Sequence, residues 1–357
     1  MNAPLVHERV AVRRTDLACT DEASRLDAWV RAQPGATPFH LPRWLNAIER
    51  GTGNKAYCLV AENDVGEIAG LVPLHAIGSP LFGRALVSSG FAVGGGILAG
   101  SQGVADRLAD AVWDLARELK CPTAELRGGA VPHHGWVVKT DAHANFEREL
   151  AGDDEAQLLA IPRKQRAEVR KGLDKRLVVE TGNGPRDLDW HYRVYAESVR
   201  NLGTPVFSRA LMAETLQAFG DDADILTVLS DGKPVASVLS LYFNGAVMPY
   251  WGGGVWEARA LRANDVMYYA LMNHARRRGC LRFDFGRSKL DSGAYFFKKN
   301  WGFEPEPLNY SVRAADGSEP RDVNPNSAKY RSIVAAWQKL PLPVANLIGP
   351  WISRGLG

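Results

Sequence analysis

Two stretches of the chain share one pattern of apolar and polar positions. Residues 56–77 (AYCLVAENDVGEIAGLVPLHAI) read as strand, polar turn and strand, and so do residues 224–244 (DILTVLSDGKPVASVLSLYFN). In the second stretch, Asp231 and Gly232 supply a two-residue turn that favours a hairpin. The pattern therefore predicts one β-hairpin in each half of the chain.

The two halves also continue alike after the hairpins. A glycine-rich stretch follows in each half, at 93–96 and at 251–254, and an amphipathic helix comes next, at 104–120 and at 264–279. Each helix leads into a strand that begins with a cysteine. The order strand, strand, strand, helix, strand thus occurs twice, and we expect a right-handed helical crossover between parallel strands in each half.

The two cysteine-led strands are residues 121–127 (CPTAELR) and 280–287 (CLRFDFGR). Asn264 is the expected N-cap of the helix before the second of them, and Gly279 is expected to end that helix. Further elements are expected between and after the repeats: a basic helix at 161–176, a strand at 177–180, helices near 187–201 and 208–219, and a helix at 327–338.

With 357 residues, the chain is long for a single core. We therefore expect an α/β protein with mixed sheets in two domains, residues 1–160 and residues 161–340, followed by an apolar tail at 341–357. Packing of this tail on the body of the protein is the favoured interpretation. Peripheral contact with the inner membrane is the alternative.

Composition narrows the class of protein further. Hydrophobic residues make up 46% and charged residues 23%, as in ordinary globular proteins, and a net charge of +3 gives no argument for DNA as a partner. The four cysteines lie far apart and form no CxxC pair, which argues against a structural zinc site. No run of apolar residues has the length of a signal peptide core or a membrane span, so a cytoplasmic location is expected.

The segment from Cys280 to Phe303 carries the densest chemistry. Its apolar strand contains the carboxylate of Asp284, and a buried carboxylate is costly unless it is paired or hydrogen-bonded. Open α/β sheets bind ligands where their strands end. A hydroxyl and four cations that suit an anionic ligand follow this strand: Ser288, Arg287, Lys289, Lys298 and Lys299.

A second candidate for the site is the strand at 246–254 (AVMPYWGGG). Pro249 removes a ladder donor, which favours a bulge or an edge and would let neighbouring strands part. The next four residues are then expected to line a cleft in which glycines let a ligand approach the backbone. These residues are Tyr250, Trp251, Gly252 and Gly253.

The basic helix is a third candidate. Arg163, Arg166 and Arg170 recur at i, i+3 and i+7 and so share one helical face. Such a stripe suits the phosphates of a lipid-linked sugar or of a tRNA, although a solvated face is equally compatible with it.

Several longer phrases resemble a known family. IPRKQRAEVRKG (161–172), FDFGRSK (283–289), YFFKKNWGFEPEPLNY (295–310) and NPNSAKYRSIVAAWQKLP (324–341) are similar to FemAB-related proteins that accompany exosortase and PEP-CTERM systems. The repeated element order also resembles two GNAT-type N-acyltransferase halves. The resemblance implies a tandem GNAT fold and the transfer of an acyl or aminoacyl group to an amine of an envelope or exopolysaccharide precursor.

The chemistry that such a transfer needs suggests roles for individual residues. Asp284 would be the base that removes a proton from the incoming amine, with a structural pairing to Arg282 or Arg287 as the alternative. Tyr295 would be the acid that protonates the leaving group. The second half would carry the chemistry and the donor, whereas the first half, which ends its strand in Glu125-Leu126-Arg127, would shape the acceptor site.

The donor stays open between acyl-coenzyme A and aminoacyl-tRNA. ARALRAND (258–265) occupies the place where coenzyme A-dependent relatives carry a Q/R-x-x-G-x-G/A loop. Arg259 fits its first position, but Arg262 and Asn264 stand where glycines belong, which counts against coenzyme A. No metal and no permanently bound cofactor is expected. A non-catalytic module that binds an anionic glycan or a biosynthetic partner is the alternative function.

Overall fold

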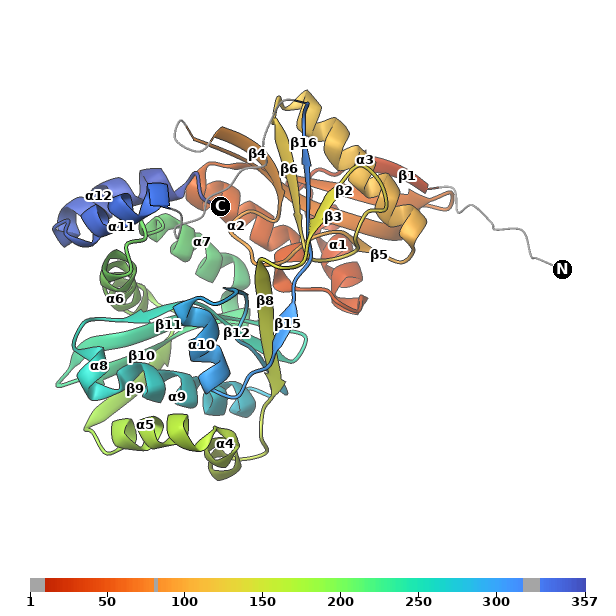
Figure 1. Cartoon of the computed structure of the whole chain (residues 1–357). Helices are drawn as coiled ribbons and strands as arrows, with labels where there is room; N and C mark the ends of the chain where they lie inside the picture. Colours follow the sequence, from red (N-terminus) through yellow and green to blue (C-terminus); the bar gives the residue numbers. More distant parts are fainter. Residues whose placement is uncertain (1–9, 80–82, 317–327) are drawn as a thin grey trace. The chain divides into compact units, whose positions relative to one another are not determined.

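The structure, a computed structural model, describes residues 10–79, 83–316 and 328–357 (Figure 1). The chain divides into two compact units. Unit 1 comprises Met1–Thr140, Asn309–Val323 and Arg354–Gly357, and unit 2 comprises Asp141–Leu308 and Asn324–Ser353. The chain therefore leaves unit 1, builds most of unit 2, and returns to unit 1 with residues that follow Leu308.

Unit 1 contains a mixed sheet in the order β1-β2-β3-β4-β6-β16-β7, with β5 paired to β3. Strands β1 to β4 are antiparallel neighbours, β4 and β6 run parallel, and β16 lies between β6 and β7. Its elements are β1 (Val10–Arg14), α1 (Thr20–Ala32), α2 (Pro42–Thr52), β2 (Lys55–Asn63), β3 (Ile68–Ser79), β4 (Gly83–Ser88), β5 (Leu98–Ala99), α3 (Gln102–Glu118), β6 (Thr123–Arg127), β7 (Val137–Lys139) and β16 (Tyr310–Ala314).

Helix α3 forms because its apolar residues recur at helical spacing and Ser101 caps its start. The Ser101 side chain accepts a hydrogen bond from the N–H of Val104. Val104, Leu108 and Val112 are buried against the apolar face of the sheet. This packing places α3 as the crossover between the parallel strands β4 and β6.

Unit 2 contains a second mixed sheet in the order β14-β8-β13-β12-β11-β10-β9, with β15 paired to β8. Strands β9 to β12 are antiparallel, and β12 and β13 run parallel. Its elements are β8 (His143–Glu149), α4 (Asp154–Ala160), α5 (Arg163–Leu173), β9 (Leu177–Gly182), α6 (Pro185–Asn201), α7 (Arg209–Phe219), β10 (Ala223–Ser230), β11 (Lys233–Phe243), β12 (Ala246–Gly254), α8 (Ala258–Leu261), α9 (Ala263–Arg277), β13 (Arg282–Asp284), β14 (Ser288–Lys289), α10 (Gly293–Asn300), β15 (Pro305–Pro307), α11 (Ala328–Gln338) and α12 (Leu342–Ser353).

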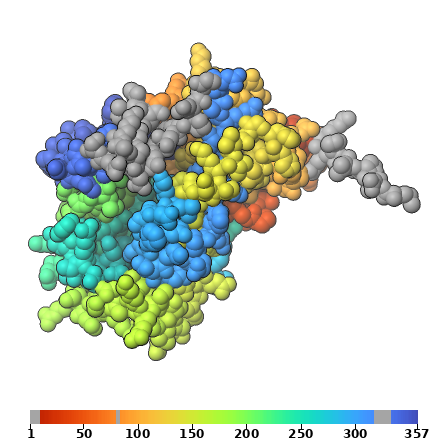
Figure 2. Space-filling view, in the orientation of Figure 1, coloured from red at the N-terminus to blue at the C-terminus, as the bar shows by residue number. Residues whose placement is uncertain are grey.

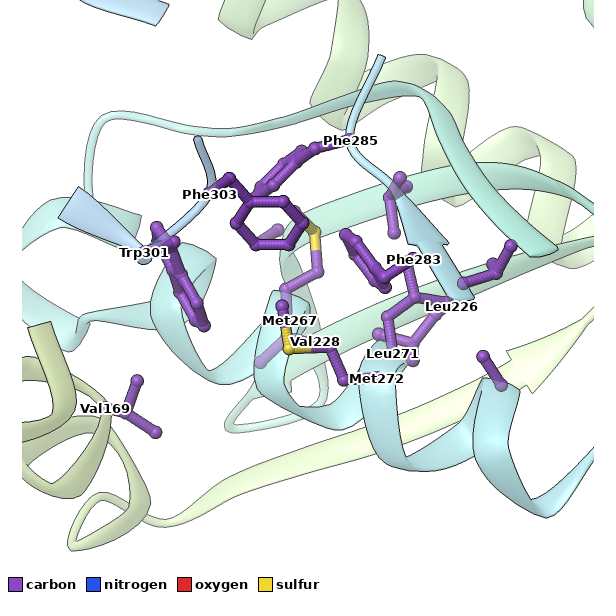
Figure 3. Close-up of a cluster of buried hydrophobic side chains, with 14 of the residues drawn as sticks. Val169, Leu226, Val228, Met267, Leu271, Met272, Phe283, Phe285, Trp301 and Phe303 are labelled. Atoms are coloured by element: carbon purple, nitrogen blue, oxygen red, sulfur yellow. The ribbon is translucent and has the colours of Figure 1, made fainter. Parts of the chain in front are cut away.

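The core of unit 2 lies between α9 and one face of this sheet (Figure 3). Met267 and Leu271 of α9 meet Phe283 of β13, and Phe285, Trp301 and Phe303 extend the same cluster. Helix α6 packs on the other face, where Ser237 of β11 lies 3.0 Å from the ring of His191. The sheet is thus covered on both faces.

The predicted repeat is confirmed. β2, β3, β4, α3 and β6 in unit 1 follow the same order as β10, β11, β12, α9 and β13 in unit 2, and the last two strands of each set pair in parallel. The predicted hairpin turn is also confirmed, because Asp231 and Gly232 both have positive φ angles, 48° and 75°.

Several details differ from the expectations. Asn264 does not cap α9, which begins at Ala263 after Arg262, a residue with φ of 55°. Residues 141–160 fold with unit 2, because β8 pairs with β13 through Asp284 and Glu147. The apolar tail forms a helix, α12, in spite of Pro350. Within the described ranges, no helix combines the length and the apolar character needed to cross a bilayer.

Candidate active site

The strands β12 and β13 part soon after they meet. They pair only at Ala246 with Arg282 and at Val247 with Phe283, after which β12 continues to Gly254 and β13 ends at Asp284. On its other side, β12 shifts register against β11, so that Tyr250 is an additional residue after Pro249. This bulge bends β12 next to the place where β13 stops, and it agrees with the bend expected from Pro249.

Asp284 lies at this opening and is buried, with 7% of its surface exposed. Its carboxylate accepts a hydrogen bond from the N–H of Gly286 at 2.8 Å and another from the amide of Asn145. Burial raises the pKa of Asp284 to about 6, with the Glu147 carboxylate acting in the same direction and Lys298 against it. Asp284 therefore changes charge close to neutral pH, as a base for an amine must.

Lys298 reaches the same turn from α10 and is also buried. Its Nζ donates to the carbonyl of Gly286 at 2.8 Å and to that of Arg287 at 3.0 Å, above the rings of Phe146 and Phe285. Burial lowers the pKa of Lys298 to about 7, and Asp284 opposes this shift. A carboxylate and an amine, Asp284 and Lys298, thus lie at the end of β13 with pKa values near neutral pH.

The other predicted residues of this segment lie around them. Ser288 is buried in β14, and its hydroxyl has no hydrogen-bond partner among the described residues. Arg287 is half-buried and lowers the pKa of Lys298. Lys289 lies in β14 beside Ser288 and pairs in register with His143. Asp284, Arg287, Ser288, Lys289 and Lys298 are therefore brought together.

Tyr295 and Lys299 lie on one face of α10, as their spacing predicts. The Lys299 Nζ lies 5.8 Å from the centre of the Tyr295 ring, and that ring meets Phe146 edge-on at 5.3 Å. Tyr295 thus rests partly on the core of unit 2, and Lys299 is exposed.

The predicted residues of β12 have strong packing roles. Trp251 is buried and meets the rings of Tyr250 and Phe207. A Cβ on Gly253 would lie 2.2 Å from the Ser198 Oγ, and one on Gly252 would lie 2.9 Å from Val238. These glycines are required for the close approach of α6 and β11 to β12, whether or not a ligand also reaches the backbone there.

In the turn before α9, an arginine adopts a left-handed backbone conformation of the kind that glycine favours. Arg262 has a left-handed φ, and its guanidinium pairs with Glu168 of α5 at 2.8 Å. Arg259 stacks on the exposed Trp256, and the buried Oδ1 of Asn264 has no partner within the described residues. A pocket of about 300 Å³ adjoins this turn and is lined by Lys171, Asp174, Lys175, Ala260 and Arg262.

The three arginines of α5 are not part of the group at the end of β13. Arg163 and Arg170 are exposed, and Arg166 donates to the carbonyl of Leu159 at 2.9 Å. Helix α5 instead joins the start of α9, where Gln165 donates to Asp265 at 2.6 Å. The predicted site residues therefore fall into separate groups: one at the end of β13, with Tyr295 and Lys299 on the adjoining α10, one on β12, and one at the junction of α5 and α9.

The sequence analysis missed the contribution of β8. This strand supplies Asn145 and Glu147, which tune Asp284, and Phe146, which supports Lys298. A signal was present, because His143–Glu149 (HANFERE) alternates apolar and polar residues, and Ala144 and Phe146 are the buried ones.

Unit 1 has a different arrangement at the corresponding position. Glu125 occupies the place of Asp284 in β6, since Ala124 and Leu126 on either side point into the core as Phe283 and Phe285 do. However, the Glu125 carboxylate accepts a hydrogen bond from the Arg127 guanidinium at 2.6 Å. Within the described ranges, no cluster of three His, Cys, Asp or Glu side chains is suited to a metal ion.

Comparisons with known proteins agree with this geometry. Residues 162–299 match the model of the acetyltransferase (GNAT) domain, whereas no curated protein matches the chain. The crystal structure of FemX is similar with a TM-score of 0.66 at 15% identity, covering 84% of this chain and 96% of that one. A tandem GNAT protein from the clavulanic acid biosynthesis pathway has a TM-score of 0.56 at 15% identity, with 87% and 100% covered.

The C-terminal domain of a putative lysylphosphatidylglycerol synthetase from Agrobacterium fabrum is also similar, with a TM-score of 0.57 at 14% identity and coverage of 84% and 93%. At these identities, the structural likeness establishes the fold, which is that of tandem GNAT proteins. The GNAT domain match falls on unit 2, the unit that contains Asp284. The protein is an acyltransferase that uses a GNAT domain.

Proposed function

We propose that the protein transfers an acyl or aminoacyl group to an amine of an envelope or exopolysaccharide precursor, with Asp284 as the general base. The observation that carries this proposal is the buried Asp284, whose pKa is raised to about 6 where β12 and β13 part. An ammonium substrate must lose a proton before or during attack on a carbonyl, and a carboxylate of this pKa accepts it at neutral pH.

The backbone of β12 would hold the donor. Beyond Val247, β12 no longer pairs with β13 and continues to Gly254. Its N–H groups would therefore be able to bind the donor carbonyl and stabilise the oxyanion that forms on it. The carbonyl would form again from the oxyanion when the bond to the leaving group breaks. Tyr295 on α10 would supply the proton to that group.

The phosphates of the donor fit the junction of α5 and α9. Lys171, Lys175 and Arg262 line its pocket together with Asp174 and Ala260, and the N–H groups of Ala263 and Asn264 precede the first hydrogen bonds of α9, which Asp265 and Val266 donate to Arg262. A phosphate there belongs equally to acyl-coenzyme A and to aminoacyl-tRNA, so both donors are part of the proposal. Of the two donors, tRNA is the longer polyanion. The arginines of α5, Arg163, Arg166 and Arg170, suit it.

The acceptor is proposed from chemistry and sequence resemblance together. The motifs at 283–289 and 295–310 are similar to FemAB-related proteins of exosortase and PEP-CTERM systems, which supports an amine-bearing glycan or peptide precursor. We place the chemistry in unit 2 because Glu125, the counterpart of Asp284 in unit 1, is paired with an arginine. Unit 1 would shape the acceptor site, and the protein would work in the cytoplasm.

Label transfer tests the proposal. Radiolabelled acetyl-coenzyme A and radiolabelled alanyl-tRNA are the donor probes, and chitosan oligosaccharides and a lysyl peptide are the amine probes. Asp284→Asn should lower kcat at least about 100-fold and leave donor binding intact, because it removes the base but keeps the shape. Asp291→Asn, an exposed change in the same segment, is the matched control. Full activity in Asp284→Asn, or no transfer from either donor, would contradict the proposal.

A further inference from the structure

Helix α12 buries its small residues and exposes its large apolar ones, which is the opposite of the usual arrangement of a surface helix. Its buried residues are the small ones, Ala345, Gly349 and Ser353, at spacings of four. A Cβ on Gly349 would lie 2.9 Å from a methyl group of Val206, and the Ser353 hydroxyl donates to the Val206 carbonyl at 2.9 Å. Small residues on this face let α12 lie close against the body of unit 2.

The large apolar residues of α12 lie on its opposite side. Val344, Leu347, Ile348 and Trp351 recur at i, i+3, i+4 and i+7, which makes one continuous stripe. Leu347 is 79% exposed and Trp351 is 59% exposed. In Figure 2 the last helices, in the deepest blue, lie at the surface. A surface helix ordinarily turns such a stripe inward, so this stripe is directed at something outside the chain.

The charges that flank α12 in the sequence indicate what kind of surface the stripe faces. Residues 339–357 contain Lys339 and Arg354 and neither aspartate nor glutamate, and α12 itself carries no charge. An uncharged apolar helix that follows Lys339 and precedes Arg354 in the sequence has the pattern that suits a bilayer with anionic headgroups. Tryptophan favours the boundary between headgroups and acyl chains.

A second copy of the chain fits this face less well. A two-fold dimer through α12 would bring cations of the two copies together at the ends of the helices, whether these run parallel or antiparallel. Four partly exposed side chains also cannot supply the ~800 Å² per partner of a standard interface.

We propose that α12 is a membrane-docking helix that lies flat on an anionic lipid surface with Val344, Leu347, Ile348 and Trp351 inserted between the headgroups. The helix would be held to unit 2 by Ala345, Gly349 and Ser353, so docking would bring the transferase to a membrane surface. The inference is independent of the transfer reaction, because binding is measured without a donor or an acceptor.

The test is sedimentation of the full chain with vesicles of phosphatidylcholine alone and of phosphatidylcholine with phosphatidylglycerol. We expect binding to the anionic vesicles that weakens with salt. The double variant Leu347→Asn/Trp351→Ser should lower the affinity by about tenfold or more, since it removes most of the inserted apolar surface. Lys339→Glu should weaken binding to the anionic vesicles more than to the neutral ones.

The matched control is Leu281→Asn, because Leu281 is exposed to a similar extent, 72%, in the loop before β13. Equal loss of binding in this control would overturn the assignment to α12, as would unchanged binding in the double variant. Circular dichroism confirms folding of each variant, and sedimentation equilibrium gives the oligomeric state. A dimer that the double variant dissociates, without vesicle binding, would also overturn the proposal and identify the stripe as a self-interface. A monomer that binds neither kind of vesicle would overturn it as well.

Discussion

At the scale of single residues, two neighbours on β8 shift the pKa of Asp284 in opposite directions. The Asn145 amide donates to its carboxylate and lowers its pKa, whereas the Glu147 carboxylate raises it. Glu147 is itself held by Arg282, whose guanidinium lies 2.7 Å away. The neighbours on β8 thus tune the base through a hydrogen bond to its carboxylate and through a nearby like charge.

This tuning predicts opposite shifts of the acid limb of the pH profile. In the wild-type protein, kcat/KM should rise with pH through about 6 as Asp284 ionises. Glu147→Gln should move the rise to lower pH because a like charge is removed. Asn145→Ala should move it to higher pH because the carboxylate loses a donor. Label transfer across pH 4 to 8 measures both, and parallel shifts would contradict a tuning role.

Lys298 predicts a pH dependence of stability. Its pKa falls from 10.5 in the unfolded chain to about 7 in the folded protein. Between these values the unfolded chain binds more protons at this group, so the contribution of Lys298 to the free energy of unfolding should rise with pH from about 7 to about 10.5, while the raised pKa of Cys58 acts against it above about pH 9. Lys298→Met should remove this rise, whereas the neighbouring exposed change Lys299→Met should keep it. Urea unfolding at several pH values is the measurement.

At the scale of elements, the contact between α6 and β12 depends on the absence of a side chain at Gly253. Gly253→Ala should destabilise the protein by about 1–3 kcal/mol, because its Cβ would lie 2.6 Å from the Cβ of Ser198. A double-mutant cycle with Ser198→Gly should recover much of this loss. Gly293→Ala is the control, since a Cβ there meets nothing within 4 Å. Equal costs for the two glycine changes would contradict a packing origin.

The elements also show what a sequence can predict. Hairpins, the crossover helix α9 and the strand β12 follow from local periodicity and turn residues, so the repeated fold was predictable. Strand β8 is short and pairs with three strands that are distant in sequence, so its place in the site was not. Arg262 takes a left-handed φ that its residue type disfavours. Its neighbours Glu168 and Gly172 on α5 hold that turn, and no local rule contains them.

The candidate site was predicted in the same uneven way. The pattern around Asp284 and Lys298 stands out because polar residues interrupt an apolar strand and an aromatic helix. The partners that shift their pKa values lie on β8, more than a hundred residues earlier in the chain. The arginines of α5 were a separate candidate because of their charge and spacing, and the structure places α5 against α9, away from the end of β13.

At the scale of the whole molecule, unit 1 depends on a strand that the chain supplies late. β16 pairs with β6 along its full length and with β7 on its other side. A chain that ends after Leu308 should therefore leave β6 with an unpaired edge and should aggregate. A chain that ends after Asp316 keeps β16 and is the matched comparison, since both lack α11 and α12. Hydrogen exchange at the amides of β4 and β6 distinguishes them, and equal protection would contradict the role of β16.

The late arrival of β16 has a consequence during synthesis on the ribosome. All of the residues from Asp141 to Leu308 emerge before the strand that fills the gap between β6 and β7. The sheet of unit 1 must therefore remain incomplete while residues 141–308 of unit 2 are translated. The usual order, in which the first domain to be made is the first to finish folding, does not hold in this protein, because unit 1 needs β16 and unit 2 then needs α11 and α12.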